Sequence, residues 1–385
     1  MEVYGFIFSV VELVVFGVLL LAFFYQLYFY LRYMNGVLRH RNRIKNGRVS
    51  FETQQPPVSV IICAKDEAEN LRKYLPTVLQ QEYPEYEVVV INDGSTDATE
   101  HLLRDLCKEH PHLKTTFIPV DAKNISTKKL GITLGVKASK HDILLFTDAD
   151  CMPEDKTWIA RMMRNFTRET DFVLGYGAYF EKKGFLNRLI TYDTLFIGLQ
   201  YMGMALSGKP YMGVGRNMAY RKETFYKQKG FASFLGLASG DDDLMVNAAS
   251  TPWNTRVEVA SDSITWSEPN ETFKGWLYQK QRHLSVASFY KSSSKFRLFF
   301  EPFTRAIFYI AFLLSMIFGG MIVRIAAGVL LLARFLFQVI IINSSSKHFS
   351  GRKYILSLPV LDIYLPLVSL YIYMFGKKGR NIRWK

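Results

Sequence analysis

The chain contains few cysteines. Cys63, Cys107 and Cys151 are the three cysteines among 385 residues, and their spacing is not that of a metal site. So small a number cannot supply the disulfide framework of a small secreted domain, which excludes that class. Cys151 follows a pair of acids, but a soft thiolate suits zinc better than magnesium. We therefore expect Cys151 to have a packing role.

Acidic residues are scarce relative to basic ones. The chain has 34 Asp and Glu against 48 Lys and Arg, a net charge of +14. Much of the excess lies beside apolar segments, in Arg39-His-Arg-Asn-Arg-Ile-Lys45 and in the tail from Lys377 to Lys385. Such clusters are typical of contacts with anionic lipids and of topology signals. We therefore expect membrane lipids as partners and no nucleic acid.

Apolar residues, by contrast, are abundant and fall in long runs. Residues 6–30, 306–323, 325–342 and 354–375 are almost continuously apolar. Each run approaches or exceeds the roughly 18–20 residues that cross a bilayer, which predicts an integral protein of the inner or plasma membrane. The basic cluster at residues 39–45 follows the first run with no acid in it, so we expect the residues after it to be cytosolic.

The last apolar run is less regular than the others. It contains Pro359, Asp362 and Pro366. Four full spans would place the basic tail outside, against the positive-inside rule, so this run is interpreted as either re-entrant or interfacial. The two runs before it are interpreted as a hairpin that turns near Gly319-Gly320. The side of the membrane on which the chain ends is left open.

Composition divides the chain into six segments. Strand-like and helix-like patterns alternate from residue 58 onward, which predicts an α/β domain whose ligands bind at the carboxyl ends of the strands. The segments are a transmembrane anchor (1–34), a basic linker (35–57), a cytosolic domain (58–270), amphipathic interfacial helices (271–302), membrane helices (303–376) and a basic tail (377–385).

Acids gather where the predicted strands end. The apolar run Ile143-Leu-Leu-Phe-Thr-Asp-Ala-Asp150 ends in two carboxylates. An unpaired buried carboxylate costs several kcal/mol, so this placement indicates a site for a hard cation such as Mg²⁺ or Mn²⁺. Asp93 directly follows another strand. The loop Ala64-Lys-Asp-Glu67 leads into a helix and offers backbone N–H groups to an anion.

A second group of acids lies in Ser239-Gly-Asp-Asp-Asp-Leu244. A helix N-terminus accounts well for one or two acids. Three adjacent like charges repel one another, however, and such crowding raises the pKa of a carboxylate. A raised pKa is useful in a general base, so the triplet is a candidate catalytic group.

Four motifs in order resemble the nucleotide-sugar half of the inverting family 2 glycosyltransferases. They are Ala64-Lys-Asp-Glu67, Asn92-Asp-Gly-Ser-Thr-Asp97, Lys128-Lys-Leu-Gly-Ile-Thr-Leu-Gly135 and Asp148-Ala-Asp150. The resemblance extends to the anchors and is closest to integral-membrane members related to polysaccharide synthases. It implies a Rossmann-like GT-A domain (residues 58–270) with a mixed sheet, together with transmembrane and interfacial helices.

For the donor, the resemblance implies a UDP-sugar and Mg²⁺ or Mn²⁺. Asp150 is then the metal ligand, and Asp148 lies near the ribose or the metal. Substrate contacts are further implied for Asp93 at the uracil end, for Lys128 or Lys129 at the diphosphate, and for Ala64, Asp66 and Glu67 in the first loop.

For the acceptor, the resemblance points to the loop Tyr211–Arg221, with Gly215 and Asn217, and to a carboxylate base in the triplet. Aligning the family's E-D-x-D-L-like motif on Asp243-Leu244 makes Asp241 the base, and aligning it on Gly240 makes it Asp242. We favour Asp241 from the sequence.

A final motif, Gln279-Lys-Gln-Arg-His283, matches the family's Q-x-x-R-W except that histidine replaces tryptophan. It implies that Gln279 contacts the acceptor and Arg282 the diphosphate. Histidine is a weaker platform for a growing sugar chain, which favours a single or short transfer to a lipid-linked or glycan acceptor in cell-envelope glycan biosynthesis. The alternatives are a processive polysaccharide synthase and a non-catalytic subunit of a glycan assembly complex.

Overall fold

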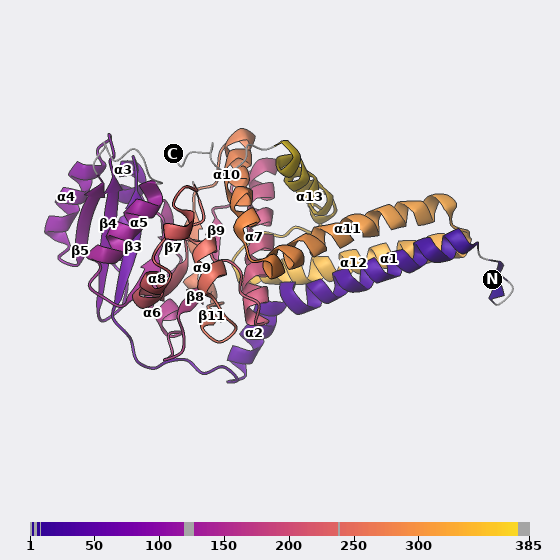
Figure 1. Ribbon diagram of the computed structural model, residues 1–385, viewed down its shortest axis with the longest axis horizontal. Helices are drawn as coiled ribbons and strands as arrows, with labels where there is room; N and C mark the ends of the chain where they lie inside the picture. The colour runs from indigo at the N-terminus through magenta and orange to yellow at the C-terminus, as the bar shows by residue number, and fades with distance from the viewer. Residues whose placement is uncertain (1, 4–5, 8, 119–126, 238, 376–385) are drawn as a thin grey trace.

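The computed structural model describes residues 2–3, 6–7, 9–118, 127–237 and 239–375. An α/β domain occupies one end of the molecule, and a bundle of long helices projects from it toward the N-terminus (Figure 1). The basic tail expected at residues 377–385 lies outside the described residues.

The first half of the α/β domain is a parallel sheet with crossover helices, as predicted. Every residue of its first strand is buried, which agrees with a parallel strand covered on both faces. The strands are β3 (Val58–Ala64), β4 (Tyr86–Asp93), β5 (Leu113–Ile118) and β6 (Ile143–Phe146), and the helices between them are α3 (Ala68–Leu79), α4 (Thr99–Glu109) and α5 (Thr127–Ala138).

The second half of the domain makes the sheet mixed. The seven strands lie in the order β11-β8-β10-β6-β3-β4-β5, and β10 runs antiparallel to both β6 and β8. A separate three-stranded sheet, ordered β7-β12-β9, begins directly after the acid pair. The added elements are β7 (Cys151–Pro153), α6 (Trp158–Met163), β8 (Phe172–Leu174), β9 (Gly177–Tyr179), β10 (Met218–Arg221), α8 (Lys222–Lys227), α9 (Asp243–Ala249), β11 (Thr255–Val257) and β12 (Thr265–Ser267).

A long helix, α7 (Phe185–Leu206), connects the domain to the membrane segments. It packs on the π-turn Tyr30–Met34 and on α2 (Gly36–Lys45), which follow the first apolar helix. A Cβ atom on Gly203 would overlap the carbonyl oxygen of Tyr33, and one on Gly36 would lie 2.8 Å from the Cα of Gly203. The two glycines therefore let these helices touch backbone to backbone.

The long apolar runs form helices, and within the part of the chain that the structure describes, four helices are long and apolar enough to cross a membrane. Three of them lie side by side in the bundle, while the fourth lies at an angle beside α7 and α10 (Figure 1). The expected hairpin turn falls at Gly319-Gly320, where α11 ends and α12 begins. The helices are α1 (Val10–Phe29), α11 (Ser292–Phe318), α12 (Met321–His348) and α13 (Leu358–Phe375).

The segment at 271–302, which is expected to form amphipathic interfacial helices, contains α10 and the first part of α11. Helix α10 (Phe273–Val286) contacts α13, and a short 3₁₀ turn follows it. Helix α11 then starts at Ser292 and continues through Pro302 into the bundle without a break. The boundary that composition indicates at residue 302 therefore lies inside α11 and is not a break between two helices.

Candidate functional site

The loops after β3 and β4 are bonded to each other at the carboxyl edge of the sheet. Asp66 has a positive φ of 53°, and its carboxylate accepts a hydrogen bond from the Thr96 N–H at 2.7 Å. The Ser95 hydroxyl accepts from the Asp66 N–H at 2.9 Å. Glu67 donates its N–H to Thr99. These bonds hold Asp66 and Glu67 in one unit with the second motif, directly after Ala64, the last residue of β3.

Two further carboxylates lie at the ends of neighbouring strands. Asp93 is the last residue of β4 and is 3% exposed. Asp148 follows β6 by two residues, and its side chain is 30% exposed. Because β6, β3 and β4 are adjacent parallel strands, both acids lie on the same edge of the sheet.

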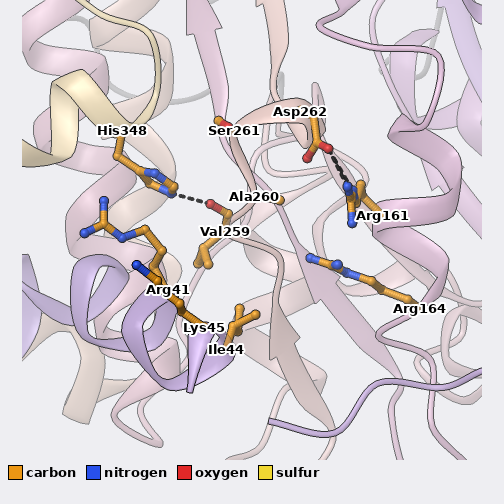
Figure 2. Close-up of a pocket in the computed structure, with 10 residues that line it drawn as sticks. All are labelled: Arg41, Ile44, Lys45, Arg161, Arg164, Val259, Ala260, Ser261, Asp262 and His348. Atoms are coloured by element: carbon orange, nitrogen blue, oxygen red, sulfur yellow. Dashed lines mark hydrogen bonds and ion pairs between the residues drawn. The ribbon is translucent and has the colours of Figure 1, made fainter. Parts of the chain in front are cut away.

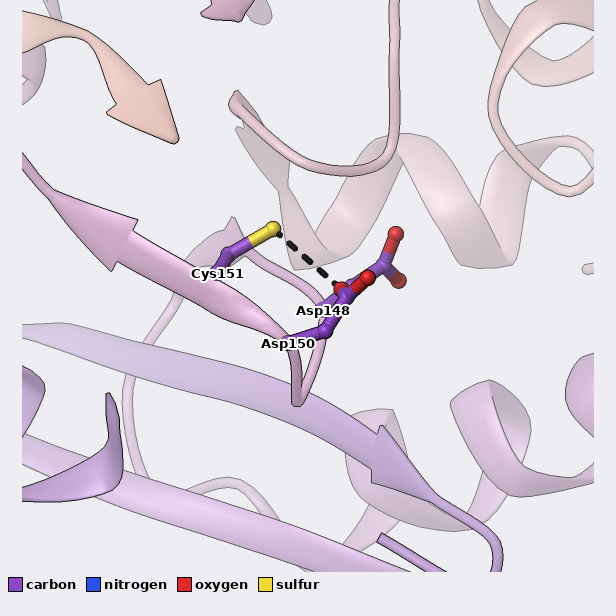
Figure 3. A group of neighbouring side chains, drawn as sticks. All are labelled: Asp148, Asp150 and Cys151. Carbon is purple, nitrogen blue, oxygen red and sulfur yellow. Dashed lines mark hydrogen bonds between the residues drawn. The ribbon is translucent and has the colours of Figure 1, made fainter. Parts of the chain in front are cut away.

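The acid pair and the cysteine after it form the one group of possible metal ligands found among the described residues. The side-chain ligand atoms of Asp148, Asp150 and Cys151 lie within 4.8 Å of one another (Figure 3). Burial raises the pKa of the Cys151 thiol well above its usual value. The thiol also lies 2.9 Å from the Ser267 hydroxyl. A thiolate is a soft ligand that suits zinc better than magnesium, whereas the two carboxylates form a donor set suited to a hard cation.

Lys128 connects this acid pair to the acid triplet. Its Nζ lies 3.0 Å from Asp148 Oδ1 and 3.5 Å from Asp241 Oδ2. Burial, the largest single effect, raises the pKa of Asp241, but the charges of Lys128, Arg282 and Lys129 and a backbone hydrogen bond together hold the pKa below its usual value. A small cavity of about 20 Å³ lies here, lined by Lys128, Asp148, Gly215 and Asp241 among others. The Lys128 ammonium group therefore lies within ion-pair distance of both the acid pair and the acid triplet.

Lys129, the next residue, faces the opposite way and is fully buried. Its Nζ donates to the carbonyl oxygens of Phe234, Leu237 and Ser239 at 2.6 to 2.8 Å. These carbonyls belong to the loop that precedes the acid triplet. Lys129 therefore holds the loop in place, whereas Lys128 faces the candidate site.

The three acids of the triplet point to three different partners. Asp241 faces Lys128, as described. Asp242 caps α9, accepting from the Asp243 N–H at 2.8 Å, and its other oxygen accepts from the Gly215 N–H at 2.8 Å. Burial and the Asp241 charge raise the pKa of Asp242. Asp243 accepts from the Tyr290 hydroxyl at 2.6 Å.

The Gln279–His283 motif lies on α10, beside the triplet. Arg282 donates to the Ser239 hydroxyl at 3.3 Å. Gln279 donates to the Tyr179 hydroxyl at 2.9 Å, so it approaches the small sheet. Between them, Lys280 forms a buried ion pair of 2.7 Å with Asp193 of α7. The motif therefore includes a structural cation that fixes α10 to the helix beneath it.

The loop after α7 contains one predicted residue in an unexpected position and one that was missed. Asn217 is fully buried, and its amide bonds to the Tyr176 and Ser263 carbonyls and to the Trp158 indole. This position gives Asn217 a structural role in the loop, because no face of its amide is left for substrate. Arg216, which the sequence analysis did not select, packs its guanidinium over the Tyr179 ring at 4.2 Å.

Arg216 also acts on the acid pair. Burial, the largest single effect, lowers the pKa of Arg216, but Tyr179, Cys151, Asp150 and Asp148 together raise it above its usual value. Its guanidinium donates to the Gly177 carbonyl at 3.1 Å. Arg216 stands between Gly215 and Asn217, the two residues predicted in this loop, and its charge was the signal that could have identified it.

Family matches cover both halves of this arrangement. Residues 59–228 match the glycosyl transferase family 2, and residues 149–375 match the glycosyl transferase family group 2, which is more than half of the chain. The fold is that of a GT-A glycosyltransferase with added apolar helices. The chain belongs to the family 2 glycosyltransferases, as the motifs predicted.

Individual relatives agree with this assignment. The probable glycosyltransferase YdaM of Bacillus subtilis is 26% identical over 314 residues, which cover 75% of this chain and 73% of YdaM. The poly-beta-1,6-N-acetyl-D-glucosamine synthase of Staphylococcus epidermidis is 32% identical over 108 residues, covering 28% of this chain and 25% of the synthase. The mannosyltransferase PcManGT of Pyrobaculum calidifontis, solved with GDP-Man and Mn²⁺, has a TM-score of 0.58 at 15% identity and covers 94% of this chain and 100% of its own. This last similarity confirms the fold.

Proposed function

We propose that the protein is a membrane-bound inverting glycosyltransferase that moves a sugar from a UDP-sugar to a lipid-linked or glycan acceptor at the cytosolic leaflet. The observation that carries the proposal is the position of Lys128, between Asp148 on the donor side and Asp241 in the triplet. A cation there faces the place where a diphosphate leaves and lies beside the carboxylates that can activate an acceptor.

On the donor side, the chain supplies carboxylates and cations at the sheet edge. Asp93 is placed for the nucleoside, and the loop of Asp66 and Glu67 closes that end of the site. Asp148 and Asp150 fit a divalent ion, which when bound neutralises the diphosphate leaving group. Lys128 stabilises the same developing charge because its side chain is only 15% exposed and is held by two carboxylates. The Mn²⁺ reported with the mannosyltransferase neighbour supports such a metal.

On the acceptor side, we assign the general base to Asp242. Its Oδ2 accepts a hydrogen bond from the Gly215 N–H in the expected acceptor loop, and burial and the Asp241 charge raise its pKa, which makes it a stronger base than an ordinary carboxylate. Asp241 has a lowered pKa and pairs with Lys128, which suits it to holding that lysine. These contacts therefore support the alignment on Gly240, which makes Asp242 the base, over the alignment on Asp243-Leu244, which makes it Asp241.

The helix α10 places Arg282 and Gln279 over the same region. Arg282 is held by Ser239, the residue two before the triplet, and is placed to meet the diphosphate. Phe273 and Phe289 are exposed at the two ends of this segment, as is Phe296 at the start of α11. Exposed aromatic residues beside apolar helices are typical of a membrane interface, which supports an acceptor that arrives from the bilayer.

A processive polysaccharide synthase is the second candidate, because several relatives are named as poly-beta-1,6-N-acetyl-D-glucosamine synthases. His283 in place of tryptophan favours the shorter product. A non-catalytic subunit is disfavoured by the presence of Asp93, Asp150 and all three triplet acids.

The test is nucleotide release by the purified full chain in detergent, with a panel of UDP-sugars and with GDP-Man. We expect release from a UDP-sugar that needs Mg²⁺ or Mn²⁺ and stops with EDTA. Products from a labelled donor then separate single transfer from polymerisation by their length. Release with GDP-Man alone would refute the UDP assignment, and no release with any donor would refute the enzyme.

A further inference from the structure

A second, basic cavity lies away from the candidate catalytic site. It has a volume of about 340 Å³, within the range of small-ligand pockets. Arg41 and Lys45 of α2 line one side, Arg161 and Arg164 the other, and His348 closes it at the end of α12 (Figure 2). Four cations from two distant parts of the chain therefore meet around one cavity.

The cations on the two sides differ in their partners. Arg161 is paired with Asp262 at 2.7 Å, and Arg164 makes two hydrogen bonds of 2.8 Å to Glu258. Among the described residues, no salt bridge is formed by Arg41 or Lys45. The paired arginines form a fixed wall, and the α2 cations leave an unneutralised positive charge at the mouth.

The backbone around the cavity is also held in place. His348 lies 2.7 Å from the Val259 carbonyl through its Nε2 atom, which fixes the end of α12 to the loop after β11. Ile44 and Val259 add apolar surface between the charges. A cavity lined by four cations with a smaller apolar part suits an anionic group attached to an apolar molecule.

The cavity lies where the bundle meets the α/β domain. Arg41 follows Met34, the end of the first candidate span, by about two helical turns. His348 is the last residue of α12, another candidate span. A ligand whose phosphate reaches this cavity can therefore keep its acyl chains in the bilayer.

We propose that this cavity binds the phosphodiester headgroup of an anionic membrane lipid. The assignment depends on membrane attachment and not on the transfer reaction, so it can fail or hold independently of the proposed activity. Bound lipid would fill the cavity between α2 and the loop after β11, and so fix the α/β domain at the membrane surface.

The experiment measures lipid retained by the full chain in detergent, by native mass spectrometry with added phosphatidylglycerol or phosphatidylcholine. The variant Arg41→Gln/Lys45→Gln removes the free cations. The control Arg39→Gln/Arg43→Gln removes the same charge, at the same spacing, from positions that do not line the cavity. We expect phosphatidylglycerol to bind the first variant roughly thirtyfold more weakly, about fivefold per cation, and the control nearly as well as the parent.

Two further arms complete the test. Ser261→Glu adds a carboxylate to the lining from a different element and should weaken phosphatidylglycerol binding in the same way. Inorganic phosphate and glycerol 3-phosphate should compete poorly at matched concentration. Equal loss in the control variant, retention in both cavity variants, or full competition by soluble phosphate would each overturn the lipid site.

Discussion

The backbone N–H of Gly215 donates a hydrogen bond of 2.8 Å to Oδ2 of Asp242, and this bond joins the expected acceptor loop to the acid triplet. A Cβ atom added at Gly215 would lie 3.5 Å from the same oxygen, an ordinary van der Waals distance. The bond thus fixes the Asp242 carboxylate toward that loop, and the proposed roles of the three acids can be tested one by one.

The first prediction concerns the base. Asp242→Asn keeps the shape of the side chain but cannot accept a proton, so kcat should fall by about a hundred- to ten-thousandfold while donor binding changes little. Asp241→Asn should weaken donor binding as well, because Lys128 loses a partner. Steady-state rates and donor titrations of both variants check this. If Asp241→Asn alone loses kcat, the base is Asp241.

The second prediction concerns the pH profile. The Asp241 charge raises the pKa of Asp242 and the Lys128 charge lowers it. A base must be deprotonated, so activity is lost as pH falls through its pKa. The acidic limb of kcat/KM should therefore move to lower pH in Asp241→Asn and to higher pH in Lys128→Gln.

Lys137→Gln is the matched control for the lysine, because Lys137 lies on the same helix and is exposed. Its profile should match that of the parent. If the limb moves in the same direction in Asp241→Asn and Lys128→Gln, Asp242 is not the titrating base.

The third prediction separates the acids from the thiol at the candidate metal site. Asp150→Ala should abolish the activation of transfer by Mg²⁺ or Mn²⁺, a loss of more than about a hundredfold. Cys151→Ser should leave the metal titration unchanged, since the protonated thiol packs against Ser267. A weakened metal response in Cys151→Ser would show that the thiol is a ligand.

The fourth prediction concerns a polar network inside the helical bundle. Asp362 of α13 is fully buried and accepts from Arg334 at 2.8 Å and from Gln338 at 2.8 Å, and Arg305 lies 3.3 Å away. Removing one member of such a network leaves buried cations unpaired. Asp362→Leu should therefore lower the free energy of unfolding by about 3–5 kcal/mol.

Thermal unfolding of the full chain in detergent measures this loss. Leu367→Ala is the control on the same helix, because Leu367 is 58% exposed, and it should change the free energy by less than about 0.5 kcal/mol. Equal midpoints for the two variants would mean that the network contributes no stability.

The fifth prediction concerns the side on which the chain ends. Because α13 lies beside α7 and α10, we expect its last turn on the side of the catalytic domain, opposite the turn between α11 and α12. In a Cys107→Ser background, an impermeant maleimide should label Met374→Cys from the cytosolic side and Met321→Cys from the other. Native Cys107 in the parent marks the side of the domain. Labelling of both positions from one side would mean that α13 crosses the membrane.

Local motifs predicted the sheet edge well. The strand ends near Ala64 and Asp93 and the acids after Phe146 were all predicted, because buried parallel strands are continuously apolar and their ends are abruptly polar. The helical hairpin at Gly319-Gly320 was visible for the same reason.

Relations between distant segments could not be read from the chain. The roles within the triplet depend on Lys128, Gly215 and Tyr290, each far from it in sequence. Asn217 was predicted as a substrate contact. Its complete burial could not be predicted, because no sequence pattern shows that an amide side chain is buried. Helix α7 was not predicted, because polar residues such as Asp193 interrupt its apolar face. The buried partner of Asp193, Lys280, lies far from it in the sequence.

The close crossing at Gly36 and Gly203 has a practical consequence. Residues Phe29, Tyr33 and Met34 belong to the same hydrophobic core as Met202 of α7, so the anchor is an integral part of the enzyme rather than a removable tether. A fragment that begins at the basic linker would expose that face of α7 to water and should aggregate. Work on the isolated α/β domain is therefore expected to fail, and the membrane-embedded chain is the smallest unit worth purifying.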